Sequence, residues 1–212
     1  MAMLTEQDRE QIAEILADLS RPVTVHVFTD DCRTCDDAVE LNRELAALAE
    51  EIDVEFHDLD GEVAAEYGAD RYETGPVQVI EADGVSGVKY FGLPGGQEIN
   101  SYLSDLVEVS AGESELPEDV KSAVREIDER VELKVFVTPT CPHCPGAVQT
   151  AHRFAIENDA ISAEMIEAQE FMDVSQEYGV RGVPQINVND RDGQFKGNQP
   201  PQQFLQEVQR AL

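Results

Sequence analysis

The sequence predicts an α/β protein made of two tandem units, each with a central mixed β-sheet flanked by helices. Three observations support this prediction. Short apolar, β-branched segments alternate with helix-like segments along the chain. The two halves repeat each other at an offset of 109 residues, and each half carries one C-x-x-C motif. A chain of 212 residues is long enough for two small domains.

The division between the units is expected where the periodicity lapses, at residues 110–115. Beyond it, Pro117 followed by two acidic residues is typical of a helix start. Leading helices are therefore expected at about residues 5–19 and 117–130. We accordingly expect the first unit to span residues 1–112 and the second to span residues 113–212.

A buried strand follows each leading helix and runs directly into a C-x-x-C motif. These strands are expected at residues 23–29 and 133–138, where β-branched and apolar residues dominate. A helix is expected immediately after each motif, so the cysteines should lie at helix N-termini. The partial positive charge and free N–H groups there favour the thiolate form of cysteine.

The rest of each half repeats in the same order. A second strand begins seventeen residues after the second cysteine of each motif, and a short helix then ends at a capping glycine, Gly68 or Gly179. A proline opens the third strand, 44 residues after the first cysteine in one half (Pro76) and 43 in the other (Pro184). A fourth strand and a closing helix complete the predicted order α-β-α-β-α-β-β-α.

Acidic residues dominate the composition, because 44 Asp and Glu face 15 Lys and Arg and the formal net charge is -29. Such a charge repels phosphate backbones and anionic lipids, so nucleic acid and membranes are not expected partners. It fits a salt-accumulating halophile, because at 1 M salt the Debye length falls to about 3 Å. No apolar run approaches the ~20 residues of a membrane helix, and the opening residues lack the apolar core of a signal peptide. A cytoplasmic location is therefore expected.

All four cysteines lie in the two motifs, Cys32 and Cys35 in the first and Cys141 and Cys144 in the second. In a cytosolic chain, C-x-x-C indicates either metal ligation or redox chemistry. A zinc ribbon places about 15–20 residues between its two pairs, whereas 105 residues separate them here and no histidine pair has ligand spacing. We therefore expect no metal. No phosphate loop or dinucleotide fingerprint is visible, so the only expected redox groups are the disulfides themselves, and electrons must arrive from another protein.

These features resemble the thioredoxin fold, in which a redox motif at a β–α junction is followed by a proline at the start of a later strand. The tandem arrangement is similar to the archaeal protein disulfide oxidoreductases, a glutaredoxin-like family with two such units and one C-x-x-C in each. The segments 138–145 (TPTCPHCP) and 89–94 (KYFGLP) are close to that family's pattern. The resemblance covers nearly the whole chain.

The resemblance implies a protein disulfide oxidoreductase that works by thiol–disulfide exchange. Cys32 and Cys141 would attack the substrate disulfide, and Cys35 and Cys144 would resolve the mixed disulfide. Protein disulfides would be the substrates, and a thioredoxin-reductase-like flavoprotein would supply the electrons. A peroxiredoxin is a further expected partner.

The resemblance also gives a role to the prolines that open the third strands. Pro76 and Pro184 would follow cis peptide bonds, and the backbone of Gly75 and Val183 would bind a substrate strand beside the cysteines. The alternative is that each is an ordinary proline of an edge strand.

Residues in and around the motifs predict different reactivity at the two sites. At the second, His143 can donate a hydrogen bond or positive charge to the Cys141 thiolate, and Pro142 fixes the turn. At the first, Arg33 can assist Cys32 in the same way, but four acids oppose a thiolate there: Asp30, Asp31, Asp36 and Asp37. We therefore expect the second site to be the stronger oxidant and to dominate attack.

His26 lies six residues before Cys32, where thioredoxins carry a buried aspartate that serves the resolving cysteine. A proton relay and an ordinary core histidine are both open for it, and the second unit has Val135 at the matching position.

Two other functions are compatible with the motifs. The tandem fold at the front of bacterial alkyl hydroperoxide reductase flavoproteins is a dedicated electron relay from a flavoprotein reductase to a peroxidase, although it has usually lost the first motif. A metal-binding C-x-x-C module is the second alternative. The net direction of exchange is left open by the sequence.

Overall fold

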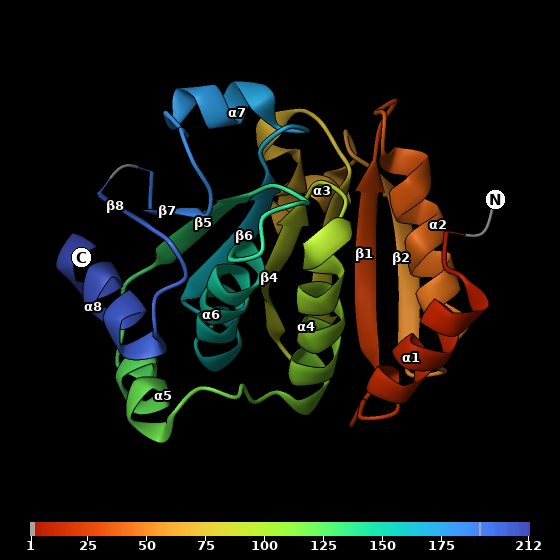
Figure 1. Ribbon diagram of the computed structural model, residues 1–212, viewed down its shortest axis with the longest axis horizontal. Helices are drawn as coiled ribbons and strands as arrows, with labels where there is room; N and C mark the ends of the chain where they lie inside the picture. The colour runs from red at the N-terminus through yellow and green to blue at the C-terminus, as the bar shows by residue number, and fades with distance from the viewer. Residues whose placement is uncertain (1–2, 191) are drawn as a thin grey trace.

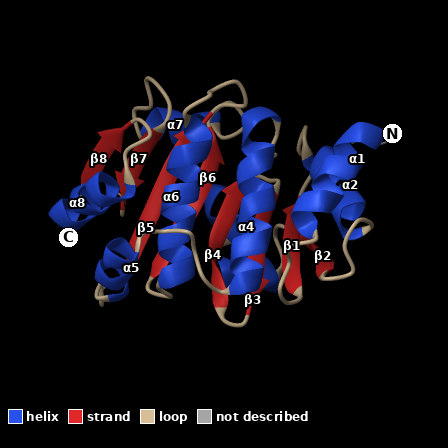
Figure 2. Ribbon diagram, turned by 60° about the horizontal axis from the view of Figure 1, so that its bottom comes forward, coloured by secondary structure: helices blue, strands red, loops and turns tan. Residues whose placement is uncertain are grey.

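The eight strands of the protein form one continuous sheet with helices on both faces, in a computed structural model that describes residues 3–190 and 192–212 (Figures 1 and 2). From edge to edge the strands are ordered β2-β1-β3-β4-β6-β5-β7-β8. Their bounds are β1 (Val23–Thr29), β2 (Ile52–Asp58), β3 (Val77–Ala82), β4 (Val85–Phe91), β5 (Val131–Val137), β6 (Ile161–Glu167), β7 (Gln185–Val188) and β8 (Gly193–Lys196). The predicted α/β class and mixed sheet are confirmed.

The helices divide unequally between the two faces. One face packs the main core beneath α1 (Glu6–Leu16), α2 (Cys35–Ala46), α4 (Ile99–Ala111), α5 (Glu118–Arg125), α6 (Cys144–Glu157) and α8 (Pro201–Ala211). The other packs a smaller core beneath α3 (Glu62–Tyr67), the 3-10 helix η1 (Ala69–Tyr72) and α7 (Met172–Glu177). A second 3-10 helix, η2 (Gly96–Glu98), leads into α4. No described helix is both long and apolar enough to span a lipid bilayer.

The two halves of the sheet repeat one pattern and join edge to edge. The first unit contributes β2-β1-β3-β4 and the second contributes β6-β5-β7-β8. Strands β4 and β6 pair in parallel from Val88↔Ala163 to Phe91↔Ile166. At the start of this seam a Cβ on Gly87 would lie 2.6 Å from the carbonyl oxygen of Ile161, so only glycine allows this approach. The sequence predicted a sheet for each unit, and the structure merges them into one.

Both leading helices are shorter than predicted, for local reasons. Helix α1 begins with a capping box between Thr5 and Asp8 and ends at Leu16, after which residues 17–18 form a turn. Helix α5 ends at Arg125, where the Asn158 side chain donates a 2.7 Å hydrogen bond to the carbonyl of Val124 in the last turn and a 2.8 Å hydrogen bond to the carbonyl of Ile127 beyond the helix. A side chain distant in sequence thus helps to set where α5 ends.

A buried polar cluster lies where α4 packs on α6. The Oδ2 atom of Asp105 accepts a hydrogen bond from the Tyr90 hydroxyl and lies 2.5 Å from Nδ1 of His152. All three side chains are completely buried. Since β4 and α4 belong to the first unit and α6 to the second, this cluster joins the units on the helical side of the seam.

Glu98, the last residue of η2, gives stability a dependence on pH. Its side chain is 1% exposed, Oε2 accepts a 3.0 Å hydrogen bond from Ser101, and Oε1 has no described partner. Burial raises the pKa of this carboxyl from 4.5 to about 7, against the opposing effects of Ser101 and His152. The folded state therefore holds a proton that the unfolded chain releases, and the stabilisation is lost as pH rises from 4.5 towards 7.

Glu98→Gln should consequently match the wild type at pH 4 and exceed its unfolding free energy above pH 7, by up to about 3 kcal/mol. Urea unfolding at both pH values measures this difference. An equal difference at both values would contradict the assignment.

Candidate functional site

Both C-x-x-C motifs connect a strand to the helix that follows it. Cys35 is the first residue of α2, after β1, and Cys144 is the first residue of α6, after β5. The chain of pairings β1–β3–β4–β6–β5 contains two antiparallel and two parallel steps, so β1 and β5 run in the same direction. The two motifs therefore lie at the same end of the sheet, where β1 and β5 finish. Each is at a helix N-terminus, as the sequence predicted.

The four cysteines form two disulfides, Cys32–Cys35 and Cys141–Cys144. Within each pair the first cysteine is the more exposed. Cys32 is half-buried and Cys35 is 4% exposed, whereas Cys141 is 8% exposed and Cys144 is completely buried. The second disulfide is therefore less open to solvent than the first.

A cis proline lies beside the end of the strand that precedes each motif. The Gly75–Pro76 and Val183–Pro184 peptide bonds are both cis. The next residue in each case pairs with the end of the central strand, as Val77↔Phe28 and Gln185↔Phe136. A Cβ on Gly75 would lie 3.4 Å from Cys35 Sγ, so its backbone packs directly against the first disulfide.

The predicted supporting residues lie between the two cysteines of each motif. Arg33 lies exposed between the cysteines of the first motif. Burial raises the pKa of Glu167 in the second unit, and the positive charge of Arg33 is among the effects that oppose this shift. Pro142 and His143 are exposed between the cysteines of the second, with His143 at the N-cap position of α6. The second motif has no acid in the first turn of its helix, whereas Asp36 and Asp37 follow the first motif.

Asp30 contacts the sulfur of Cys35, the more buried cysteine of the first motif. Its N–H group points to Cys35 Sγ at 3.5 Å, and its carboxylate Oδ1 lies 3.4 Å from the same sulfur. It also lines an open acidic hollow with Asp58, Asp60, Asp70 and Glu73. The sequence suggested only that Asp30 opposes a thiolate, and its contact with Cys35 adds an acceptor for the thiol proton in the reduced state.

Each motif is also contacted by the other unit. Glu170, after β6, accepts hydrogen bonds from the Thr34 hydroxyl, inside the first motif, and from the Leu93 N–H group at 3.1 Å. Conversely, the N–H group of Gln97 donates a 3.0 Å hydrogen bond to the carbonyl of Pro139, two residues before Cys141. Neither contact was predicted from the sequence.

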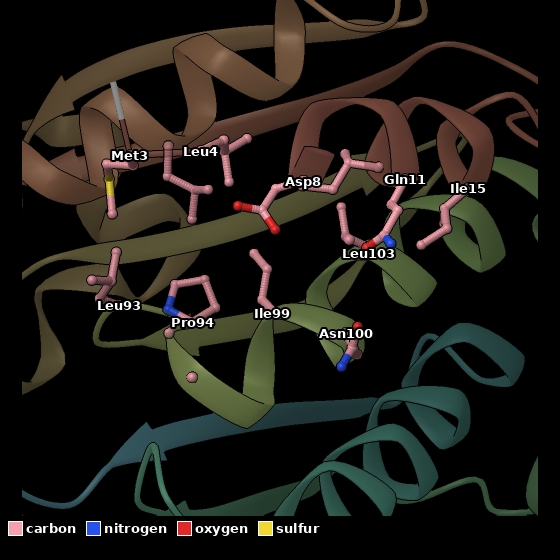
Figure 3. Close-up of a pocket in the computed structure, with 14 residues that line it drawn as sticks. Met3, Leu4, Asp8, Gln11, Ile15, Leu93, Pro94, Ile99, Asn100 and Leu103 are labelled. Carbon is pink, nitrogen blue, oxygen red and sulfur yellow. The ribbon is translucent and has the colours of Figure 1, made fainter. Parts of the chain in front are cut away.

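The segment that makes these cross-unit contacts also borders a pocket of about 330 Å³. Figure 3 shows Met3 and Leu4 on one side of it, with Leu93, Pro94 and Ile99 on the other. Its described lining includes no cysteine, so the pocket lies outside the candidate site.

His26 lies away from the cysteines, on the face covered by α3. Its described polar partners are His57, Tyr67, Glu55 and Glu81. Burial lowers the pKa of its imidazole below 6.5, although the two glutamates oppose this effect. Asp30, rather than His26, is the described titratable group in contact with Cys35.

Comparison with known proteins identifies the family. The family model described as thioredoxin domain matches residues 131–210. Over 84 residues the chain is 32% identical to a thioredoxin of Methanocaldococcus jannaschii, a match that covers 39% of this chain and 98% of that thioredoxin. The chain belongs to the thioredoxin family.

Two solved structures resemble this thioredoxin-family chain over nearly its full length. A protein disulfide oxidoreductase from Aeropyrum pernix K1 has a TM-score of 0.84 and 29% identity, covering 96% of this chain and 91% of that one. An alkyl hydroperoxide reductase subunit (AhpF) from Enterococcus faecalis has a TM-score of 0.85 and 26% identity, covering 97% and 99%. They confirm the predicted fold of two tandem thioredoxin-like units.

The chain spans about a third of the length of the first curated relatives it matches. Two of these are called NADH dehydrogenase, in Ferdinandcohnia aciditolerans and Bacillus subtilis, and the third is an alkyl hydroperoxide reductase subunit in Pseudomonas aeruginosa. Identity is 23–24% over 85–88% of this thioredoxin-family chain.

For a thioredoxin-family site, the contact between Asp30 and Cys35 predicts a slower resolving step in Asp30→Asn. Proton transfer by a positioned side chain typically accelerates a reaction by about 100-fold or more. Because this carboxylate is exposed, we expect Asp30→Asn to slow release of the mixed disulfide by only about tenfold. Stopped-flow release of the mixed disulfide formed at Cys32, in a Cys141→Ser/Cys144→Ser background, measures the rate. Asp31→Asn removes the same charge one residue away and is the control. Equal rates in the two aspartate variants would show that only the local charge matters.

Proposed function

We propose that this protein is a protein disulfide oxidoreductase that works by thiol–disulfide exchange at two sites. The observation that carries the proposal is the repeated arrangement of a disulfide at a helix N-terminus beside a cis proline. The 29% identity to the Aeropyrum pernix protein disulfide oxidoreductase, over 96% of this chain, supports it. Cys32 and Cys141 are the proposed attacking residues, and the backbone of Gly75 and of Val183, each before its proline, is the proposed contact for a substrate strand.

The proposed reaction proceeds in two exchanges. The thiolate of the attacking cysteine bonds to one substrate sulfur, the substrate disulfide breaks, and the other substrate sulfur leaves as a thiolate that takes up a proton. The resolving cysteine, after losing its proton, then attacks the attacking cysteine's sulfur and releases the second substrate thiol. The substrate disulfide gains two electrons and two protons, and the dithiol of this protein becomes a disulfide.

Reduction of insulin disulfides by dithiothreitol tests this function. The wild-type protein should accelerate the reaction well beyond dithiothreitol alone, and a variant with serine at Cys32, Cys35, Cys141 and Cys144 should not. Similar rates with both proteins would refute the proposal.

A dedicated electron relay is the second candidate function. It is supported by the 26% identity to the Enterococcus faecalis alkyl hydroperoxide reductase protein, over 97% of this chain. In this role the protein would take electrons from a thioredoxin-reductase-like flavoprotein and pass them to a peroxiredoxin. Reconstitution of NAD(P)H oxidation with such a reductase, followed by either insulin or an oxidised peroxiredoxin, separates the functions. A relay reduces only the peroxiredoxin, whereas a general oxidoreductase reduces both.

We further propose that this is a cytoplasmic protein of a halophile. We also propose that the boundary between its two units lies near Gly112. Residues 1–112 carry 26 Asp and Glu against 6 Lys and Arg, and residues 113–212 carry 18 against 9. When salt falls from about 1 M to about 0.01 M, the Debye length grows from about 3 Å to about 30 Å. Repulsion among the acidic side chains is then no longer screened. Hydrogen exchange should then show earlier opening in the first unit. Equal opening, or earlier opening of the second unit, would refute this part of the proposal.

A further inference from the structure

A group of nitrogen and carboxylate ligands lies on the α3 face of the first unit, apart from both disulfides. His26 is on β1, and Glu55 and His57 are on β2. Figure 1 shows these two strands side by side. His26 and Glu55 are neighbours across the two parallel strands. Glu55 and His57 are two residues apart on one strand, which turns both toward the same face. The pairing of β1 with β2 thus gathers three ligand-bearing side chains that are up to 31 residues apart in sequence.

The three ligand atoms form a nearly equilateral triangle. Nδ1 of His26 lies 3.2 Å from Nε2 of His57, and each of these nitrogens lies 3.5 Å from Oε2 of Glu55. In a tetrahedral site with bonds of about 2.0–2.1 Å, ligand atoms are about 3.3–3.4 Å apart. Adjacent ligands of an octahedral ion with similar bonds are only about 3.0 Å apart. The triangle therefore has the size of one face of a zinc tetrahedron.

The ring of His26 is held in the orientation that metal binding requires. Its second nitrogen, Nε2, lies 3.1 Å from the Tyr67 hydroxyl and 3.5 Å from Oε2 of Glu81. The Tyr67 hydroxyl in turn donates to Glu81. Metal-binding histidines commonly donate their other ring N–H to such a group, which fixes both the tautomer and the ring. With its proton on Nε2, His26 presents the Nδ1 lone pair to the centre of the triangle.

The second histidine is also positioned by packing. The ring of His57 stacks on Phe28 with centroids 5.0 Å apart, and on His26 with centroids 5.4 Å apart. His26 is 7% exposed, while His57 is half-buried and Glu55 is exposed. The site thus has a fixed inner side and an open outer side, through which an ion and a water molecule can enter.

We propose that His26, Glu55 and His57 bind a divalent transition-metal ion, with zinc the best fit. Two imidazoles and one carboxylate suit zinc better than magnesium or calcium, which take mainly oxygen ligands. Three protein ligands leave a fourth position for solvent. The ion would tie β1 to β2 on the face covered by α3 and stabilise the first unit, independently of the disulfide chemistry proposed above. No metal was expected from the sequence, because 105 residues separate the two cysteine pairs and because His26 and His57 lie 31 residues apart.

Zinc binding is tested on the protein with both disulfides oxidised, so that no thiolate competes, and at high potassium chloride with millimolar magnesium to saturate the acidic surface. Competition with a chromogenic chelator should show one zinc ion per chain. His57→Ala should weaken binding by about 100-fold, and Glu55→Gln by about tenfold or more. Glu50→Gln, which removes one acidic charge from the same unit, should leave the affinity unchanged.

Two further measurements keep the outcome decisive. Bound cobalt should give the intense visible absorption of a tetrahedral ion, and zinc should raise the urea midpoint of the wild type but not that of Glu55→Gln, which alters only an exposed side chain. No saturable zinc binding, or equal binding by wild type and Glu55→Gln, would overturn the proposal and identify the triangle as a hydrogen-bonded cluster.

Discussion

Cys141→Ser is expected to remove most disulfide-reductase turnover, whereas Cys32→Ser is expected to leave a substantial remainder. The reason is the charge around the sulfur of each proposed attacking cysteine. Asp36 and Asp37 occupy the first turn of α2 after Cys35, and Asp30 and Glu170 contact the first motif, while the first turn of α6 contains no acid. If this difference and His143 favour the Cys141 thiolate by about 1–2 kcal/mol, the second site is the stronger oxidant by about 20–45 mV.

Cys141 is only slightly exposed, which should slow its attack on large substrates and so oppose the electrostatic advantage of the second site. This effect needs its own control. A large protein substrate must reach a sulfur that is only 8% exposed, whereas a small aromatic disulfide meets less obstruction. Turnover is therefore measured with insulin and with a small disulfide, and each reduction potential is measured with the other motif replaced by serine. Equal losses in the two variants on both substrates, or a higher potential at the first site, would contradict the electrostatic argument.

Asp105→Ala is expected to destabilise the protein by about 2–6 kcal/mol, because each buried polar group that loses its hydrogen-bond partner costs about 1–3 kcal/mol. The change leaves the Tyr90 hydroxyl and the His152 imidazole buried without their shared acceptor. Because the cluster connects β4 and α4 to α6, the loss should affect both units together.

Urea unfolding at high salt measures this loss, with Asp105→Asn as the matched control. An asparagine oxygen can still accept from Tyr90 or His152, although not with the strength of a carboxylate, so its effect should be smaller. A loss below about 1 kcal/mol for Asp105→Ala would mean that solvent replaces the missing acceptor.

The repeated elements of the fold could be predicted because the signals are local. Strand-like runs before Cys32 and Cys141, helices after them and prolines at matched spacing are all properties of short segments. The pairing of β4 with β6 could not be predicted, since Gly87 in β4 gives no sign of the carbonyl it approaches. Sheet edges choose partners by tertiary packing, which a periodicity does not encode.

The candidate site could likewise be predicted only in part from the sequence. The motifs and the prolines at 76 and 184 lie where the sequence repeat placed them, and both prolines follow cis bonds, as the family resemblance implied. By contrast, Glu170 accepts a hydrogen bond from Thr34 across 136 residues of sequence. Asp30 was interpreted from its charge alone, and only the fold reveals which sulfur it meets. Sequence reasoning thus locates the groups that react and misses the groups that the other unit or a loop conformation brings to them.

The seam between β4 and β6 also limits how electrons can travel within the proposed enzyme. Four strand-to-strand steps separate β1 from β5, a span of about 19 Å at the usual spacing. Exchange requires one sulfur to bond to another, and a continuous hydrogen-bonded sheet holds the two disulfides apart. Fully reduced, one molecule stores four electrons in two separate pairs. Equalising those pairs requires a shuttle, either a small thiol, a client or a second molecule of the protein, so the rate at which the two sites equilibrate should rise with the concentration of that shuttle.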